Sequence, residues 1–293
     1  MGKSDLHIIR LGFGCMSLGN EQQQIETILH AAIAGGINFF DTADLYDKGL
    51  NEERVGKALK QKRKDVIIAS KAGNQWRPDG SGWDWNPSKD YILACADKSL
   101  QRLQTDYIDL YQLHGGTIDD PIDETIEAFE LLKQQGKIRW YGTSSIRPNV
   151  IREYVKRSNI VSVMMQYSLL DRRPEESCLD LLQQHQIGVL ARGSVASGLL
   201  VNKPAKPYLN YSEEEVKRAA NAIATISIAE RTPAQTAIQF VLSHPALSSA
   251  VVGIRTMEQL KDALGAMKTK ALNKEELTQL RNSVVANKYE QHR

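Results

Sequence analysis

Short apolar runs alternate along the chain with longer stretches in which apolar residues recur every three or four positions. Eight of the short runs are rich in β-branched and aromatic residues, as strands are, and they cover residues 8–14, 37–42, 65–71, 107–114, 138–144, 162–167, 187–192 and 249–254. The longer stretches carry helix-ending and helix-starting signals. Residues 22–36 end in two glycines, residues 88–103 begin with a serine, and residues 121–137 begin with a proline. The pattern therefore predicts strands and helices in regular alternation.

Eight strands with helices between them predict a (β/α)8 TIM barrel of the α/β class. An open parallel sheet would use the same elements. Closure is favoured because the number of strands is eight and because polar residues gather at the C-terminal end of nearly every strand. No linker rich in Pro, Gly or Ser and no shift in composition divides the chain, so residues 1–293 are predicted to form a single domain.

Two segments are longer than the usual connections of such a barrel. Residues 72–88 are expected to form a loop rich in Gly, Pro and Trp, and residues 193–231 hold a proline-rich stretch with an extra helix from Ser212. Long loops on a compact barrel usually serve binding.

Composition narrows the class of protein. The net charge of +2 is spread over 37 basic and 35 acidic residues, which argues against nucleic acid as a partner. No apolar run approaches the ~18 residues needed to span a bilayer, and the N-terminus lacks the apolar core of a secretory signal. Three cysteines lie far apart without metal-ligand spacing. We expect a cytoplasmic protein with reduced cysteines, no metal and no membrane partner.

Candidate chemistry collects at three successive predicted strand ends. Asp41, Lys71 and His114 end the second, third and fourth strands, and Tyr46 follows in the loop after the second. Taken singly, each has an ordinary explanation: a helix cap, a surface lysine, a core imidazole and an interface phenol. Taken together they are expected to meet at one rim, because a buried lysine at a strand end needs a carboxylate partner and Asp41 lies one strand away.

Such a group would form an acid–base centre for reducing a carbonyl. A free tyrosine titrates near pH ~10, and a neighbouring cation stabilises the phenolate, so Lys71 is expected to lower the pKa of Tyr46. Asp41 would hold and balance Lys71. His114, if neutral, could donate a hydrogen bond to a carbonyl oxygen on which negative charge develops.

Over nearly its whole length the chain resembles the aldo-keto reductase family. The match rests on the segments "GFGCMSLG", "GINFFDTADLYDKGLNEERVGKAL", "IIASKAG", "LQRLQTDYIDLYQLH", "GKIRWYGTSS", "MMQYSLLDRRPEE" and "VVGIRTMEQL". The catalytic tetrad of that family corresponds to Asp41, Tyr46, Lys71 and His114. The resemblance implies an NADP(H)-dependent oxidoreductase on a metal-free barrel. Tyr46 would be the general acid, and hydride would pass from the nicotinamide to the carbonyl carbon of a small aldehyde or ketone.

The resemblance also implies which residues would bind the cofactor. Ser144 and Gln166 correspond to the carboxamide contacts, whereas Ser145 replaces the usual Asn. Arg192 stands where relatives often have an aromatic residue stacked on the nicotinamide, and a planar guanidinium could take that place. Further implied contacts are the rim residues Gly14, Cys15 and Met16, the carboxylate of Asp41, the pyrophosphate contacts Gly193, Val195 and Ser197, and Gly253, Arg255 and Gln259.

Arg255 would meet the 2′-phosphate at the N-terminus of a helix, with Gln259 at the adenosine end, which favours NADPH over NADH. An ordinary surface arginine at a helix start is the alternative. Ala263 replaces the adenine-contacting Asn of many relatives. Cys15 could also be only a small packing residue.

The substrate and the N-terminus leave questions open. Trp76, Trp83 and Trp85 either pack the long loop against the barrel or form a wall for a hydrophobic or flat carbonyl compound. Relatives usually begin with a hairpin that plugs the barrel floor; here residues 2–8 would supply its turn and second strand only, so a more exposed floor is expected.

Two alternatives belong to other functional classes. Some barrels of this family act mainly as cofactor-sensing regulatory subunits with slow turnover. A metal-dependent hydrolase is disfavoured because the first strand lacks a His-x-His pair. The physiological substrate, the preferred reaction direction, the strength of the preference for NADPH and the oligomeric state are not determined by the sequence.

Overall fold

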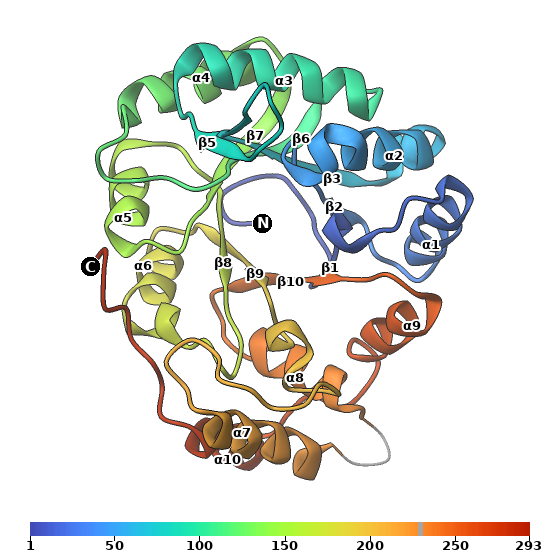
Figure 1. Ribbon diagram of the computed structural model, residues 1–293, viewed down its shortest axis with the longest axis vertical. Helices are drawn as coiled ribbons and strands as arrows, with labels where there is room; N and C mark the ends of the chain where they lie inside the picture. Colours follow the sequence, from blue (N-terminus) through green and yellow to red (C-terminus); the bar gives the residue numbers. More distant parts are fainter. Residues whose placement is uncertain (228–230) are drawn as a thin grey trace.

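Eight parallel strands close into a barrel that is surrounded by helices, as the computed structural model of residues 1–227 and 231–293 shows (Figure 1). Around the barrel the strands follow the order β1-β10-β9-β8-β7-β6-β3-β2. Their bounds are β1 Leu11–Gly14, β2 Phe39–Asp41, β3 Ile67–Ala72, β6 Ile108–Leu113, β7 Ile138–Ser144, β8 Ser162–Gln166, β9 Gly188–Arg192 and β10 Leu247–Gly253. The predicted (β/α)8 barrel is confirmed, and each of these strands lies at one of the eight predicted runs.

Ten α-helices are present in the described part of the chain: α1 Gln22–Ala34, α2 Leu50–Leu59, α3 Lys89–Leu103, α4 Ile122–Gln134, α5 Pro148–Arg157, α6 Cys178–Gln184, α7 Glu213–Ile226, α8 Pro233–Leu242, α9 Met257–Gly265 and α10 Lys274–Ser283. Short 3-10 turns occupy Cys15–Ser17, Tyr46–Gly49, Lys60–Asp65, Arg173–Glu176 and Ala196–Gly198. The extra helix predicted from Ser212 is α7, where Ser212 and Glu215 form a capping box. The predicted long segment 193–231 includes residues 228–230, which lie outside the described residues.

The core has two parts, as expected for a barrel. The larger cluster lies between the strands and the surrounding helices, and includes Phe13, Phe40 and Tyr141. A smaller cluster fills the interior near the floor, where Phe39, Leu110 and other inward side chains meet. Strand residues thus alternate between the two clusters.

The N-terminal segment corrects one expectation. Residues 2–8 form no strand, yet Leu6 is buried in the floor cluster, with Met1 and Ile8 packed against it (N at the centre of Figure 1). The segment is held in place because the Met1 ammonium donates to the Leu6 carbonyl oxygen at 2.5 Å. An irregular turn therefore closes the floor in place of a hairpin, and the expected exposure of the floor is wrong.

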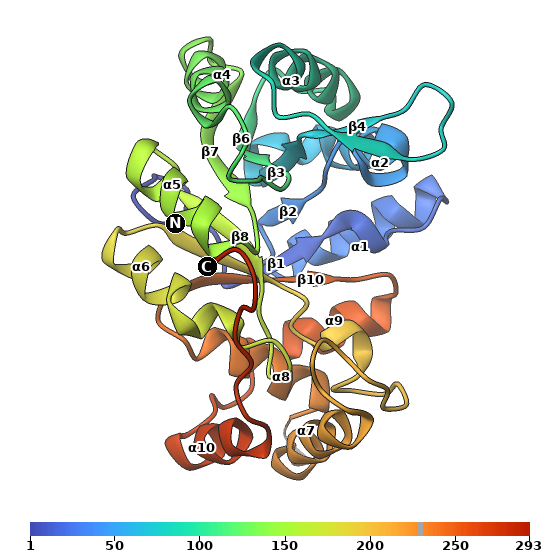
Figure 2. The same ribbon diagram turned by 60° about the vertical axis from the view of Figure 1, so that its left-hand side comes forward.

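The segment after β3 corrects another. Residues 72–88 were expected to be a loop, but Asn74–Trp76 (β4) and Trp83–Trp85 (β5) pair as an antiparallel hairpin. Trp76 lies opposite Trp83, and aromatic cross-strand pairs favour strands. Figure 2 shows this hairpin and the segment after β9 extending from the same side of the barrel, with the N-terminus on the opposite side.

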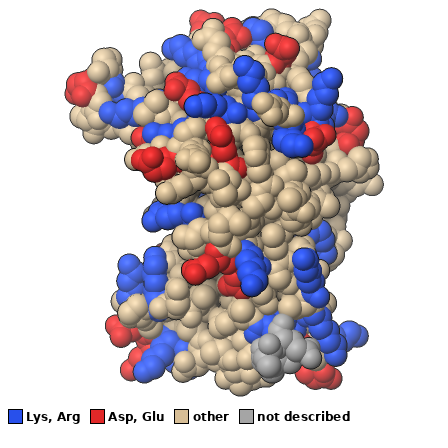
Figure 3. All heavy atoms as spheres, turned by 90° about the vertical axis from the view of Figure 1, so that its right-hand side faces the viewer, with Lys and Arg blue, Asp and Glu red and all other residues tan. Residues whose placement is uncertain are grey.

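Charged side chains of both signs are mixed on the face shown in Figure 3, where the middle of the face is largely uncharged. The surface thus carries the near-balance of 37 basic and 35 acidic residues without one dominant sign on this face. Among the helices that the structure describes, none is both long and apolar enough to span a bilayer.

Candidate active site

A cavity of about 980 Å³ opens at the C-terminal ends of the strands and contains the four predicted catalytic residues. All parallel strands end at this rim, so side chains far apart in the sequence converge there. Predicted site residues on its wall are Gly14, Met16, Asp41, Tyr46, Lys71, Trp83, Trp85, His114, Ser144, Gln166, Arg192, Gly193, Val195, Ser197, Gly253 and Gln259. The cavity is at the upper end of the ~300–1,000 Å³ usual for small-molecule sites.

Asp41 and Lys71 form a buried ion pair at the centre of this wall. Asp41 ends β2, and its register partner in β3 is Ala69, so Lys71 projects two residues further along the neighbouring strand. The Lys71 ammonium donates to Asp41 Oδ2 at 2.7 Å and to the Thr42 carbonyl oxygen at 2.8 Å. Burial alone would lower the pKa of Lys71, but Asp41 and Tyr46 raise it above its ordinary value, so the ammonium stays charged near neutral pH.

Tyr46 contacts the lysine of this ion pair. Its hydroxyl lies 3.4 Å from Lys71 Nζ at the start of a 3-10 turn. Burial raises the pKa of the phenol above its ordinary value; Lys71 acts in the opposite direction and Asp41 adds to the rise. The expectation that Lys71 brings the pKa of Tyr46 below its ordinary value is therefore wrong, because removing water from the ring outweighs the ammonium. The phenol is protonated at neutral pH.

His114 stands beside the phenol at the end of β6. Its ring meets the Tyr46 ring edge-on, with centroids 5.8 Å apart, and its backbone N–H donates to the Ala72 carbonyl oxygen at 2.7 Å. Burial, and then the charges of Lys71 and Arg192, lower the pKa of His114 to about 3. The imidazole is therefore neutral near pH 7. Its Nδ1 is buried and has no hydrogen-bond partner among the described residues.

A second layer of charge behind the tetrad was not predicted. Glu52 is fully buried, pairs with Arg102 at 2.6 Å and accepts a hydrogen bond from Ser70, the residue before Lys71. Burial and the nearby Glu52 carboxylate raise the pKa of Asp44 to about 7. Both acids belong to the segment that follows β2, so the fold supports the tetrad strands with a polar network. Helical spacing alone gave no sign that α2 buries Glu52.

The other half of the cavity is formed by the ends of β7 to β10. Gln166 and Arg192 are register partners on β8 and β9, and Arg192 Nη1 donates to Gln166 Oε1 at 3.1 Å. Gln166 Nε2 donates to the Tyr208 hydroxyl at 2.6 Å. The Arg192 guanidinium is exposed at the cavity and has no carboxylate partner within 4 Å among the described residues.

Three predicted site residues do not line the cavity. Cys15 is fully buried beneath the rim, which agrees with the packing alternative. Trp76 turns its indole N–H toward the Leu45 carbonyl oxygen at 3.3 Å and packs against Lys48, so of the three tryptophans only Trp83 and Trp85 line the cavity. The guanidinium of Arg255 reaches the Ser17 carbonyl oxygen at 3.2 Å, beside the cavity.

Several wall residues were missed by sequence reasoning, namely Asn74, Gly115, Gly116, Thr117, Ile146, Arg147, Lys203, Tyr208 and Asp262. Most of them lie in loops, and the path of a loop depends on tertiary packing, which the spacing of apolar residues does not reveal. Arg147 was recognisable only as the residue before a helix-starting proline.

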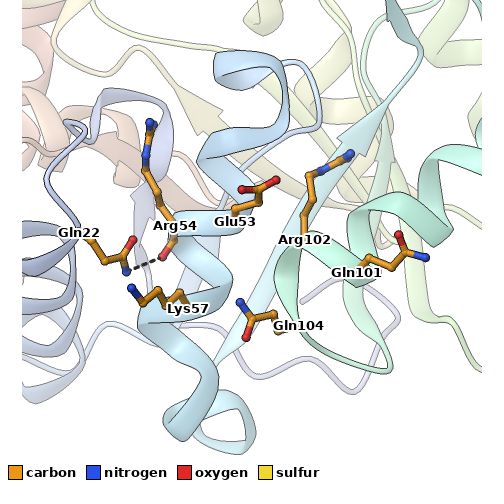
Figure 4. A pocket seen from close by; sticks show the side chains of 7 residues that line it. All are labelled: Gln22, Glu53, Arg54, Lys57, Gln101, Arg102 and Gln104. Carbon is orange, nitrogen blue, oxygen red and sulfur yellow. Dashed lines mark hydrogen bonds between the residues drawn. The ribbon is translucent and has the colours of Figure 1, made fainter.

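A separate hollow of about 470 Å³ lies outside the barrel between α1, α2 and α3 (Figure 4). Both of its arginines are engaged in ion pairs, Arg54 with Asp47 and Arg102 with Glu52. None of the tetrad side chains reaches it. Of these two cavities, only the rim cavity contains the tetrad.

Comparison with known proteins shows which sequences and structures the chain resembles. The model of the Aldo/keto reductase family matches residues 10–284. All of the chain is 52% identical to "Uncharacterized oxidoreductase YqkF" of Bacillus subtilis, of which 98% is covered. The chain is 30% identical to "NADH-specific methylglyoxal reductase" of Escherichia coli, with 91% of this chain and 92% of that protein covered. The solved structure "aldo-keto reductase AKR11C1 from Bacillus halodurans (holo form)" matches with a TM-score of 0.93 and 52% identity, over 99% of this chain and 97% of that one. The chain is therefore an oxidoreductase that belongs to the aldo/keto reductase family.

Proposed function

We propose that the protein reduces an aldehyde or ketone to an alcohol with NADPH, and that Tyr46 is the general acid. The observation that carries the proposal is the contact of the Tyr46 hydroxyl with Lys71, itself paired with Asp41, on the wall of the rim cavity. A phenol, an ammonium and a neutral imidazole at one cavity wall suit a carbonyl oxygen on which negative charge develops.

A bound NADPH would supply a hydride ion to the carbonyl carbon and become NADP⁺. The protein's part is the proton: Tyr46 donates its hydroxyl proton to the carbonyl oxygen, and an alcohol results. The raised pKa of Tyr46 keeps the proton in place until the oxygen becomes basic. Lys71, 3.4 Å away, then stabilises the phenolate, and water returns the proton. Neutral His114 donates a hydrogen bond to the same oxygen.

The second half of the cavity suits the cofactor. Ser144 and Gln166 lie on its wall, and the hydroxyl of Ser144 and the amide of Gln166 suit hydrogen bonds to the carboxamide of the nicotinamide. The exposed guanidinium of Arg192 lies beside Gln166. Gly193 has a φ of +76°, a conformation that favours glycine, and begins the segment Gly193–Gly198 that runs along the cavity. Lys203 packs across Gly198, where it could meet the pyrophosphate.

The preference for NADPH rests on Arg255. This residue precedes α9, whose N-cap is Thr256, and its backbone N–H donates to Gln259 Oε1 at 2.8 Å. A helix start with an adjacent arginine favours the 2′-phosphate. Asp262 also lines this end, but Thr232 and Gln235 donate to its carboxylate. Because one relative is NADH-specific by name, family membership alone does not decide this choice.

The substrate side is bounded by Trp83 and Trp85, which favour a carbonyl compound with a hydrophobic part. All three cysteines are free and buried, in keeping with the reducing environment of the cytoplasm that we propose for this protein.

The test is oxidation of NADPH with a panel of aldehydes and ketones, for the wild type and Tyr46→Phe. We expect Tyr46→Phe to bind NADPH normally and to lose about 10²–10⁴-fold in carbonyl reduction, the usual worth of a general acid. Tyr107→Phe is the matched control, because Tyr107 stacks on Arg63 outside the rim cavity.

Equal reduction rates for Tyr46→Phe and the wild type would show that the proton donor is another group. Tight retention of NADPH with negligible turnover on every carbonyl would instead favour a cofactor-sensing regulatory subunit.

A further inference from the structure

Arg147 places a guanidinium on the substrate side of the cavity. It follows β7 and is the N-cap of α5, and it reaches across to the loop after β6, where its Nη1 donates to the Gly116 carbonyl oxygen. Gly116 is two residues beyond His114. The link therefore puts the Arg147 side chain beside the catalytic imidazole loop and away from the α9 end of the cavity.

The rest of this guanidinium has no partner in the part of the chain that the structure describes. Nε and Nη2 of Arg147 make no hydrogen bond there, and no carboxylate lies within 4 Å of its nitrogens. The nearby Asp120 is committed elsewhere, since Trp85 and Thr117 donate to it at 2.6–2.8 Å. A half-buried guanidinium with free donors suits an anionic ligand.

The net charge of the cavity wall also favours an anionic ligand. Four cations, Lys71, Arg147, Arg192 and Lys203, face two anions, Asp41 and Asp262, which leaves a net charge of +2. Lys71 is neutralised by Asp41. Arg192 and Lys203 lie in the half that suits the cofactor and its phosphates, so the cofactor leaves Arg147 without a counter-charge.

An apolar surface leads from the tetrad toward this cation. The Trp85 ring lies over Gly115, where a Cβ atom would come within 3.0 Å of it, and Ile146 exposes 37% of its surface beside Arg147. A substrate chain that lies along Trp85 and Ile146 would end at the guanidinium.

We propose that the carbonyl substrate carries a carboxylate and that Arg147 binds it, so that the enzyme prefers oxo acids to neutral aldehydes. This inference rests on the proposed carbonyl reduction and deepens it. The carboxylate would accept hydrogen bonds from Nε and Nη2 while Nη1 stays on Gly116.

The test compares kcat/KM for acid and neutral substrates of equal chain length: succinic semialdehyde against butanal, and adipic semialdehyde against hexanal. Charge-assisted hydrogen bonds predict a preference of about tenfold or more for at least one acid in the wild type. In Arg147→Gln, which keeps a donor for Gly116, the preference should disappear while kcat/KM for the neutral aldehydes changes little. Arg147→Lys should restore part of it.

Arg152→Gln is the matched control, because it removes an exposed positive charge from the same helix outside the cavity and should keep the preference. If the variants fail to fold, inhibition of the wild type remains: butyrate should compete with butanal, and neutral butyramide should not.

Equal kcat/KM for acid and neutral substrates in the wild type would overturn the inference and leave carbonyl reduction standing. Equal losses on both substrates in Arg147→Gln would also overturn it, since Arg147 would then only join two loops. Absence of any carbonyl reduction would overturn the proposed function and this inference together.

Discussion

The two halves of the cavity differ in how firmly their charges are held. On the tetrad side, Lys71 is 1% exposed and bonded to Asp41, Thr42 and Tyr46. On the other side, Arg192 on the cavity wall and Arg255 beside the cavity are exposed, and the guanidinium of each bonds to a single oxygen atom. A buried charge needs partners within the fold because it has lost its water, whereas an exposed charge stays hydrated and is free to bind a ligand. The charges of the tetrad half are thus held in place by the fold, whereas the guanidinium groups of the other half stay accessible to solvent.

The largest expected effect comes from breaking the buried pair. Lys71→Met leaves Asp41 buried without its cation, and we expect the free energy of unfolding to fall by about 3–5 kcal/mol. Carbonyl reduction should fall by at least about 10²-fold, because the Tyr46 phenolate loses its stabilising charge. Chemical denaturation and steady-state kinetics measure the two losses.

The double variant Asp41→Asn/Lys71→Met sharpens this comparison. Removing both charges should recover most of the stability but none of the activity. Lys89→Met, in the exposed pair with Glu127, is the matched control and should cost far less stability. A Lys71→Met variant as stable as Lys89→Met would mean that the buried pair is not an organising feature of this half.

The next effect is a pH dependence from His114. The pKa is about 3 in the folded protein and about 6.5 in the unfolded chain, so the unfolded state binds more protons between these values. Stability from neutral His114 is fully present above pH 6.5 and is lost as pH falls toward 3, by up to about 1.4 kcal/mol per pH unit.

Denaturation of the wild type and His114→Gln at several pH values isolates this contribution, because other titrating groups such as Asp44 are common to both. The wild type should lose more stability on acidification across this window. Parallel curves would place a charged or freely exposed imidazole at this position.

The smallest effect is expected at the exposed end. Arg255→Ala should weaken NADPH binding by about fivefold to tenfold and leave NADH nearly unchanged, because an exposed arginine interacts with the 2′-phosphate through solvent. Titration of cofactor fluorescence at low and high salt measures both. Lys261→Ala removes a charge from the same helix and is the control. Equal weakening of NADPH and NADH would remove Arg255 from the phosphate site.

Much of this arrangement follows from the sequence. Periodicity predicted the eight strands because buried strands require apolar runs, and polar residues at their ends predicted Asp41, Lys71 and His114 at one rim. The spacing of Tyr46 from Asp41 is local, so the short turn after β2 places it correctly. Chain order and strand register determine these positions.

Other features depend on contacts that periodicity does not reveal. The hairpin of residues 74–85 arises from pairing across a turn, and the N-terminal segment is ordered because Leu6 has a floor cluster to enter. The pKa of Tyr46 rises because burial outweighs Lys71, a balance that the identities of neighbours cannot give. Trp76 and Trp83 are cross-strand partners, yet only Trp83 faces the cavity.

The sequence by itself therefore determined the barrel and the tetrad, because both follow from spacing along the chain. Only the tertiary structure decided which side chains face the cavity, how strongly each proton is held, and that Arg147 has no carboxylate partner among the described residues. These properties depend on burial and on distances between segments remote in sequence, and both are set when the strands close.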